Sequence, residues 1–401
     1  MSYKRLIDKI VDNHLCTMCG MCEAICPADV IKLDSFGHIN KINAQGKCIE
    51  CNMCEEICPG KATNIPFIEK KIFGRKRYNN ERWFGIFDQL YDGCSIKRNV
   101  LENSASGGCA TTLLSVAMKK FDLDYILVAG RCDKTGWKAE PIMCESISKI
   151  EENSQSTYQL FPYLGILKKY LNKKKNVRIG VIGLPCHVIA IRKAQAMDNE
   201  IGKILSENIP VVMELACSSN TKVEGTISLI EQIANIDVND VKNIKYREGE
   251  YPGKVVIYTN TDQKVEIPFW KAVQHFANYK TERCLKCPDW VSGLADISFW
   301  DGDQNVFKSS FANETGIKKT STIAVRTKKG EQILRYAVDN DMIEICPKKM
   351  DISQNFGLLR KRNRYAMYER DNNEVIPDAP IINYKDDFEI VDDREFIKKV
   401  N

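Results

Sequence analysis

Uninterrupted apolar runs and helical stretches alternate along most of the chain. The runs at 125–129 (YILVA) and 177–182 (VRIGVI) are typical of buried strands, and 111–121 and 163–171 are typical of helices. This alternation predicts an α/β body with a largely parallel sheet. The segments 254–259 and 264–268 predict an antiparallel hairpin instead. We therefore expect an α/β main body with a mixed sheet and flanking helices.

The pattern changes near residue 84 and again near residue 350, which suggests three parts. We expect residues 1–68 to form a small α+β ferredoxin-like domain, 84–350 the α/β body, and 351–401 a C-terminal extension. The segment 65–80 (IPFIEKKIFGRKRYNN) is basic and has no clear period, so we expect a solvated connector there.

Composition excludes several functional classes. The chain has 401 residues, 44% of them hydrophobic, and a net charge of +5, which is too small to indicate nucleic acid as the main partner. The longest apolar stretch, 179–191, is shorter than the roughly 18 residues of a membrane span. The first ten residues carry four charges and no apolar core, so they are no signal peptide. We expect a cytoplasmic protein without a membrane span.

Cysteine is the exception in this composition, because the chain has 17 of them. Disulfides are rare in a reducing compartment, so these thiols are better read as metal ligands or reactive groups. Two copies of CxxCxxCxxxCP stand near the N-terminus. In two-cluster ferredoxins, the fourth cysteine of each copy binds the cluster of the other copy. We therefore expect a first set on one 4Fe-4S cluster, Cys16, Cys19, Cys22 and Cys58, and a second set on another, Cys48, Cys51, Cys54 and Cys26.

Zinc is the alternative for these two sets, but zinc sites favour well-separated pairs of cysteines, whereas these cysteines follow the cluster spacing. The body carries four more dispersed cysteines, the third set: Cys186, Cys217, Cys284 and Cys287. Four thiols suit a third 4Fe-4S cluster or a structural zinc, and their spacing does not choose between them. For Cys186 taken alone, a buried structural thiol is the simpler reading.

A run of small residues, Ser104 to Gly108, leads directly into a predicted helix at 110–120. Small residues allow close approach of the backbone, and a helix N-terminus offers free N–H groups, so the run is a candidate cradle for a phosphate. Ser and Gly in this position are also ordinary helix caps.

These motifs together resemble the beta-subunit family of coenzyme F-420-reducing hydrogenases and dehydrogenases. The resemblance rests on NSASGG, QSTY, VIGLPCHVIAIRK, KYREG, CLKCPDW, ADIS and STIAVRTKKG, and it covers most of 85–350. It implies FAD, a third 4Fe-4S cluster on the third set, and hydride exchange between a deazaflavin and the flavin. The residues that it would place around the flavin and its substrate are Ser104, Ser106, Gly107, Gly108, Arg247, Asp296 and Asp301. It assigns no catalytic residue.

Two positions depart from the family pattern. His187 stands where Gln is frequent, and we read it as a satisfied helix-start residue rather than a proton relay. Trp300 stands where Gly is frequent, and its indole could close or reshape the pocket for the deazaflavin.

Three functions follow from this reading. The first is an iron–sulfur flavoprotein oxidoreductase that passes electrons between coenzyme F-420 or a similar hydride carrier, FAD, three 4Fe-4S clusters and a redox partner such as ferredoxin. The second is a ferredoxin-driven flavoenzyme that reduces a small metabolite, for example a sugar derivative. The third is a non-catalytic electron-transfer subunit. A homo-oligomer and a subunit of a larger complex are both compatible with each function.

Overall fold

The computed structural model describes residues 2–34, 36, 38–39, 47–61, 63–78, 81, 83–171, 177–302, 316–350 and 357–361. Most of the predicted C-terminal extension therefore lies outside the described residues. None of the helices in these ranges combines the length and apolar character needed to cross a membrane.

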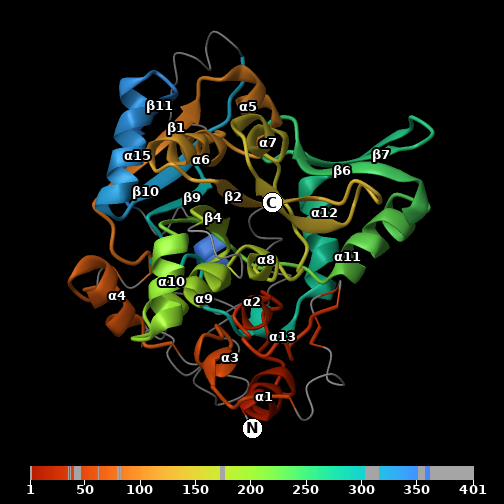
Figure 1. Cartoon of the computed structure of the whole chain (residues 1–401). Coiled ribbons are helices and arrows are strands. Elements are labelled where there is room, and N and C mark those ends of the chain that lie inside the picture. The colour runs from red at the N-terminus through yellow and green to blue at the C-terminus, as the bar shows by residue number, and fades with distance from the viewer. Residues whose placement is uncertain are drawn as a thin grey trace.

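An eight-stranded mixed sheet with the order β11-β1-β10-β9-β5-β4-β2-β3 forms the centre of the body (Figure 1). Its strands are β1 (Gln89–Ser95), β2 (Tyr125–Arg131), β3 (Ala139–Cys144), β4 (Ile179–Gly183), β5 (Val211–Leu215), β9 (Ile297–Asp301), β10 (Ser321–Val325) and β11 (Ile343–Pro347). Only the β2–β4, β4–β5 and β5–β9 pairs are parallel. The expectation of a mixed sheet is confirmed, but the expectation of a largely parallel one was wrong, because both edges consist of antiparallel pairs.

The helices lie mainly around this sheet and in the N-terminal part. They are α1 (Ser2–Leu6), α2 (Met21–Ala24), α3 (Met53–Glu56), α4 (Ile65–Phe73), α5 (Arg98–Asn103), α6 (Cys109–Lys120), α7 (Ile147–Glu152), α8 (Leu167–Leu171), α9 (Pro185–Gln195), α10 (Glu200–Asn208), α11 (Val223–Ser228), α12 (Phe269–Phe276), α13 (Glu282–Lys286) and α15 (Lys328–Asp339). Short π or 3-10 turns are η1 (Ile7–Val11), η3 (Leu229–Ile233), η4 (Val238–Asp240) and η5 (Ala277–Tyr279).

The period of two along each strand divides the core between the faces of the sheet. Leu127 and Val181 point to the face covered by α9, whereas Ile126 and Ile182 point to the face covered by α6 and α15. Successive side chains of a strand alternate between faces, so strands buried on both sides are apolar throughout. This is why the predicted runs contain no polar face.

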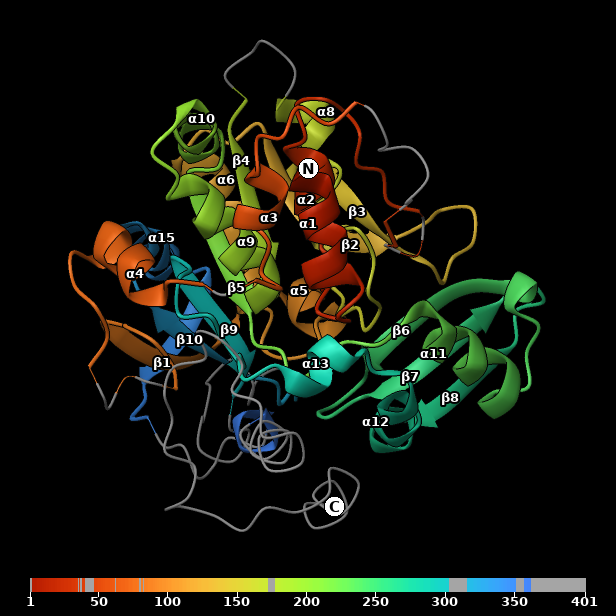
Figure 2. The same cartoon turned by 90° about the horizontal axis from the view of Figure 1, so that it is seen from below.

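The ferredoxin domain packs directly on the α9 side of the sheet, as Figure 2 shows for α1, α2 and α3. Met21 and Ile57 belong to the same hydrophobic core as α9. The Leu164 amide donates to the Cys19 carbonyl at 2.8 Å. Gly20 has φ of +82°, and a Cβ there would lie 2.7 Å from the Gly165 nitrogen. Only a glycine allows this approach of the two backbones.

A smaller lobe projects from the body at the right of Figures 1 and 2. It contains the three-stranded antiparallel sheet β6 (Val241–Glu248), β7 (Lys254–Thr259) and β8 (Lys264–Pro268), with α11 and α12 against it. The predicted hairpin is confirmed as β7 and β8.

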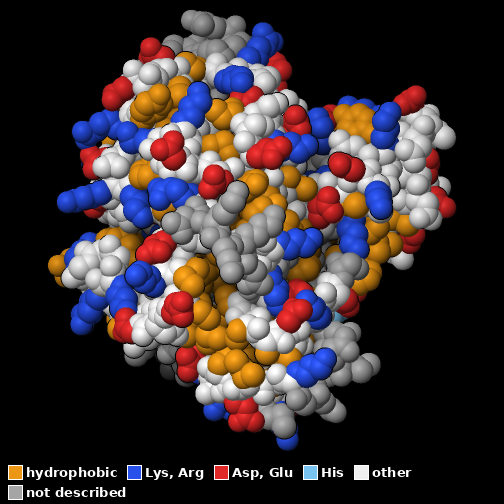
Figure 3. Space-filling model, viewed as in Figure 1, with side chains coloured by type: hydrophobic (Ala, Val, Ile, Leu, Met, Phe, Trp, Pro, Cys, Tyr) orange, Lys and Arg blue, Asp and Glu red, His pale blue; other side chains and the backbone are white. Residues whose placement is uncertain are grey.

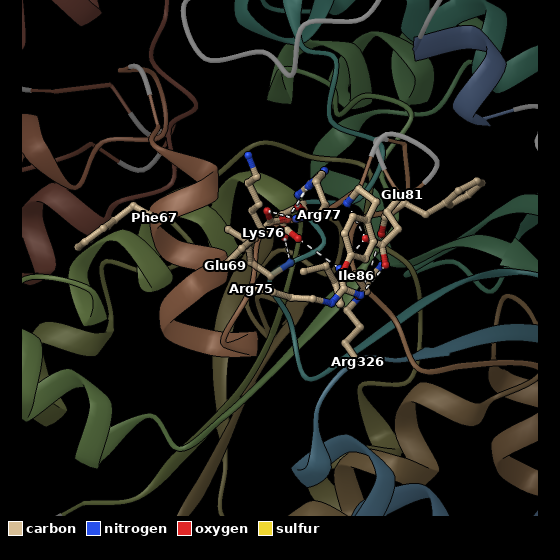
Figure 4. A network of polar contacts seen from close by, with 12 residues as sticks. Phe67, Glu69, Arg75, Lys76, Arg77, Glu81, Ile86 and Arg326 are labelled. Atoms are coloured by element: carbon tan, nitrogen blue, oxygen red, sulfur yellow. Dashed lines mark hydrogen bonds and ion pairs between the residues drawn. The ribbon is translucent and has the colours of Figure 1, made fainter.

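Residues 65–73 of the expected solvated connector form the helix α4 instead, and α4 packs on the body. The Asn64 side chain caps α4 by accepting from the Phe67 amide, and Gly74 ends it with φ of +74°. Glu69 on α4 is fully buried and accepts from Arg77, whose Nη2 donates to the Ser292 carbonyl. Figure 4 shows this network, which continues to Arg326. Its basic residues face a buried carboxylate and backbone carbonyls, which the one-dimensional pattern does not reveal.

We expect Glu69→Gln to lower the free energy of unfolding by about 3 kcal/mol, because it leaves the Arg77 guanidinium without its buried counter-ion. Anaerobic urea denaturation followed by far-UV circular dichroism measures the change. Glu152→Gln, which removes an exposed ion pair with Lys149, is the control and should leave the midpoint unchanged. Equal stabilities of the two variants would contradict a structural role for the α4 network.

Candidate functional site

A cavity of about 840 Å³ opens where the carboxyl ends of β4, β5 and β9 meet. This is the edge at which α/β sheets bind ligands. The cavity is lined by the Ser/Gly turn, by the segment 153–161, by loops after the three strands, and by lobe residues that include Arg247 and Phe269. Its size and mixed polar and apolar lining are typical of a cofactor site.

The predicted Ser/Gly cradle forms one wall of this cavity. Ser104, Ser106 and Gly108 line it, and Gly108 adopts φ of +72° at the start of α6. Gly107 does not line it, because the backbone here packs against the body: a Cβ at Gly107 would lie 2.4 Å from the Gly93 carbonyl oxygen. Gly107 therefore sets the position of the turn, whereas its neighbours Ser106 and Gly108 face the cavity.

The buried Arg247 and the exposed Asp301 form an ion pair on the lobe side of the cavity. Nη1 of Arg247 donates to both Asp301 oxygens, at 2.9 and 2.8 Å. Burial alone would lower the pKa of this guanidinium, but Asp301 and Tyr158 outweigh it and the pKa is raised. Nη2 of Arg247 is buried and has no hydrogen-bond partner among the described residues. A buried donor of this kind is costly unless it meets an acceptor, so the cavity suits a ligand with an anionic or carbonyl oxygen.

Asp296 does not line the cavity, and its predicted place in the cofactor region was wrong. Its carboxylate accepts from Arg192 at 3.1 Å, from the Val212 amide at 2.9 Å and from Thr327 at 2.7 Å. It precedes β9, at the opposite end of the strand from Asp301. The residue therefore joins α9, β5 and the start of α15 and takes no part in the cavity wall.

The thiols of the first cysteine set act on one another. Burial raises the pKa of the Cys22 thiol, and the thiols of Cys19, Cys16 and Cys58 raise it further. Burial raises the pKa of Cys16 to about 12, and Cys58 has the largest effect among the neighbouring thiols. Cys58 comes from the second CxxCxxCxxxCP copy, so the fourth cysteine of one copy acts on the first three of the other.

The second set shows the reciprocal exchange. Burial raises the pKa of Cys54 to about 12, and the thiols of Cys51, Cys26 and Cys48 add to the effect. Cys26 comes from the first copy. Cys51 is exposed, so this set reaches the surface of the molecule.

The third set also assembles, although its members come from three distant segments. Burial raises the pKa of Cys186, and the thiols of Cys217, Cys19, Cys287 and Cys284 act in the same direction. Cys217 lines the cavity. Its amide donates to the Trp290 carbonyl at 2.8 Å, which joins the end of β5 to the CxxC segment.

The three sets form a continuous series. The Cys19 thiol of the first set raises the pKa of Cys186 in the third. The Cys54 thiol of the second set raises the pKa of Cys22 in the first. A series of thiols thus runs from the cavity wall at Cys217, through the junction of body and ferredoxin domain, to the exposed Cys51.

Within the described residues, no three His, Cys, Asp or Glu side chains converge closely enough to hold a single metal ion.

His187 is buried, and its Nδ1 accepts from the Leu184 amide at 3.2 Å, which caps α9. Burial lowers the pKa of His187 to about 3. A neutral imidazole held in this way agrees with the reading of His187 as a helix-start residue.

Three side chains around the site were not singled out from the sequence. Lys319 is buried and donates to the carbonyls of Leu101, Glu102 and Ser104, which holds the Ser/Gly turn in place. Burial lowers the pKa of Lys319 to about 8. Arg283 and Trp290 flank the third set, and their places beside the CxxC motif were the only signal in the sequence.

The fold and this arrangement define an α/β iron–sulfur protein of electron transfer. Comparison with known protein families shows which family the chain belongs to. The profile of the coenzyme F-420 hydrogenase/dehydrogenase beta subunit matches at its C terminus over 176–351 and at its N terminus over 90–168. A 4Fe-4S dicluster domain matches over 15–63. The chain belongs to this beta-subunit family and carries an N-terminal 4Fe-4S dicluster domain.

Among its relatives is the coenzyme F-420 hydrogenase subunit beta of Methanosarcina barkeri, 28% identical over 70% of this chain and 88% of that protein. The coenzyme F-420-dependent sulfite reductase of Methanocaldococcus jannaschii is 21% identical over 93% of this chain but only 54% of that enzyme. A solved chain of the F-420-reducing [NiFe] hydrogenase complex of M. barkeri superposes with a TM-score of 0.55 at 25% identity, over 72% of this chain and 91% of that one.

The exchanged cysteines give a direct test of the site. We expect Cys26→Ala to lose about four irons per chain, the content of one 4Fe-4S cluster, because Cys26 completes the second set. Iron analysis and electron paramagnetic resonance of anaerobically purified protein measure the loss. Cys132→Ala, which removes a partly buried thiol outside all three sets, is the control and should keep its iron. Full iron content in Cys26→Ala would contradict the assignment.

Proposed function

We propose that this protein is an iron–sulfur flavoprotein oxidoreductase that passes electrons between a small hydride carrier, coenzyme F-420 or a similar deazaflavin, and a redox partner protein. Its cofactors are FAD in the cavity and three 4Fe-4S clusters, one on each cysteine set. The observation that carries the proposal is the series of thiol sets from the cavity wall to the surface, since such a series serves to move electrons out of a closed site.

The cavity fits FAD by its chemistry as well as by its size. Trp290, Trp300 and Phe269 supply apolar walls, and the Ser/Gly turn supplies a close backbone surface for a pyrophosphate. The unpaired Nη2 of Arg247 is a donor for an oxygen of the cofactor or substrate. Bound there, FAD would supply the exchange between two-electron hydride chemistry and one-electron transfer.

The chain's own residues have distinct parts in this function. Lys319 holds the Ser/Gly turn, and Asp301 fixes the Arg247 guanidinium in the cavity wall. Trp290 and Trp300 lie 5.0 Å apart between their ring centroids and exclude water from the wall next to Cys217. The third set adjoins this wall, so electrons that leave the cavity have a short distance to travel.

We further propose that the redox partner docks where the second set is exposed. Ile49 is 63% exposed beside Cys48 and Cys51. Hydrophobic side chains also gather in the lower part of the molecule in Figure 3, where the ferredoxin domain lies. We also propose that the chain divides into a ferredoxin domain (1–68), an α/β body (84–350) and an extension (351–401). Residues 65–68, at the end of the first part, belong to α4.

Cofactor analysis is the first test. Anaerobically purified protein should contain about twelve irons per chain, from three 4Fe-4S clusters, together with one FAD. Iron, sulfide, zinc and flavin assays measure these contents. Zinc in place of iron would overturn the proposal, and full iron content without flavin would favour the non-catalytic electron-transfer subunit.

The position of Trp300 favours a second candidate function, that of a ferredoxin-driven flavoenzyme that reduces a smaller metabolite. Its indole lines the cavity and stacks within 6.0 Å of Phe84, so it narrows the space beside Asp301.

Turnover separates the two functions. We expect the wild type to oxidise reduced coenzyme F-420 with a viologen dye as acceptor, because the cavity reaches both Arg247 and the third set. If only Trp300→Gly oxidises it, the smaller substrate is favoured. Trp270→Gly is the matched control, since Trp270 also lines the cavity but lies on the lobe. No turnover by the wild type or either variant would contradict the deazaflavin as substrate.

A further inference from the structure

Arg283 lies at the junction between the first and third cysteine sets. It stands on α13, directly before Cys284, and only 8% of the residue is exposed. Its Nη2 donates to the Pro59 carbonyl at 3.3 Å, and Pro59 directly follows Cys58 of the first set. The side chain thus reaches from the body into the ferredoxin domain.

Most of this guanidinium lacks a protein acceptor. Nε and Nη1 are buried and have no hydrogen-bond partner among the described residues. Buried donors without acceptors are costly, and a buried cation adds to that cost unless negative charge lies close by. The position therefore calls for an acceptor that the protein's own oxygen atoms do not supply.

The groups that surround Arg283 are mainly sulfur atoms. Its electrostatic neighbours are the thiols of Cys287, Cys186 and Cys284, together with the Asp289 carboxyl, and Cys58 is affected by it from the other side. Asp289 also lies 3.7 Å from the Cys287 sulfur. Once clusters are bound, these sulfurs become anionic thiolates next to inorganic sulfide, which makes them good acceptors for N–H groups.

Other cations lie near one set only. Lys361 and Lys280 act on Cys217 and Cys284 of the third set, and Lys193 donates to the Cys58 carbonyl of the first. Arg283 is affected by thiols of the third set while it acts on a thiol of the first. This shared position distinguishes it from a cation that merely balances charge.

We propose that Arg283 is a positioning and tuning residue shared by the first and third clusters. Its Nε–H and Nη1–H groups donate to cluster sulfur, and its charge makes both clusters easier to reduce. One-electron reduction adds negative charge to an assembly that is already anionic, so a buried cation and N–H donors stabilise the reduced form more than the oxidised one. The inference rests on the proposed function, because it requires clusters on both sets.

Redox titration followed by electron paramagnetic resonance tests this role in the full-length holoprotein. Arg283→Gln removes the charge, and we expect the equilibrium constant for reduction of both clusters to fall about tenfold, which is about 59 mV for a one-electron couple. Arg283→Lys keeps the charge but loses the planar fork, so its potentials should lie between those of the wild type and Arg283→Gln. Lys361→Met is the matched comparison and should lower the potential of the third cluster only.

The outcomes separate this inference from the proposed function. A wild type without iron in the third set overturns both. A wild type with all three clusters whose potentials are unchanged in Arg283→Gln overturns the tuning role alone. If Arg283→Gln loses iron, the Arg283→Lys variant is the test of the tuning role. Cluster potentials below those of the wild type in Arg283→Lys support donation from the Arg283 N–H groups to cluster sulfur, and potentials equal to the wild type overturn it. Loss of iron in both variants also overturns tuning and makes Arg283 a residue of cluster assembly.

Discussion

The close approach of the first and third cysteine sets constrains the rest of this structure. Cys19 and Cys186 belong to different domains, yet their thiols are electrostatic neighbours. The two backbones meet at Gly20 and Gly165, and a Cβ on Gly20 would lie 2.7 Å from the Gly165 nitrogen. The two parts also share a hydrophobic core that includes Met21. The ferredoxin domain is therefore an integral layer of the protein, held by backbone contact and by a common core.

The sheet topology explains why the cavity lies at the start of this series. Parallel strands β4, β5 and β9 present their carboxyl ends at one edge. Cys186 lies in the first turn of α9 after β4, Cys217 lies in the loop after β5, and Asp301 is the last residue of β9. The antiparallel lobe closes the same edge from the side and supplies Arg247. A cofactor site and a cluster site can share one wall because both are built from the ends of adjacent strands.

Buried cations recur in the body, and several of them bond to carbonyl oxygens. Lys319 binds three carbonyls at the Ser/Gly turn, and Arg326 binds those of Phe84 and Ile86. Carbonyl partners fix the position of a side chain without neutralising its charge, so Lys319 leaves positive charge beside the cavity wall at Ser104. Such a charge favours an anionic ligand in the cavity. Arg326 lies at the opposite end of the strands, where its amide donates to the Asp296 carbonyl and burial lowers its pKa to about 10.

The sequence alone determined the two ferredoxin-type sets, because cluster ligation there depends on cysteine spacing within short loops. It also predicted two strands of the central sheet, β2 and β4, whose apolar runs reflect burial on both faces. The sequence named the four cysteines of the third set as candidate ligands, but only the resemblance favoured a 4Fe-4S cluster over zinc, since these cysteines lie up to 101 positions apart along the chain. Only the tertiary structure decided that Asp296 is a structural anchor, that α4 packs on a buried glutamate, and that Arg283 faces two sets at once. Each of these depends on contacts between segments far apart in the chain, and a local pattern of residues carries no information about which distant surface it will meet.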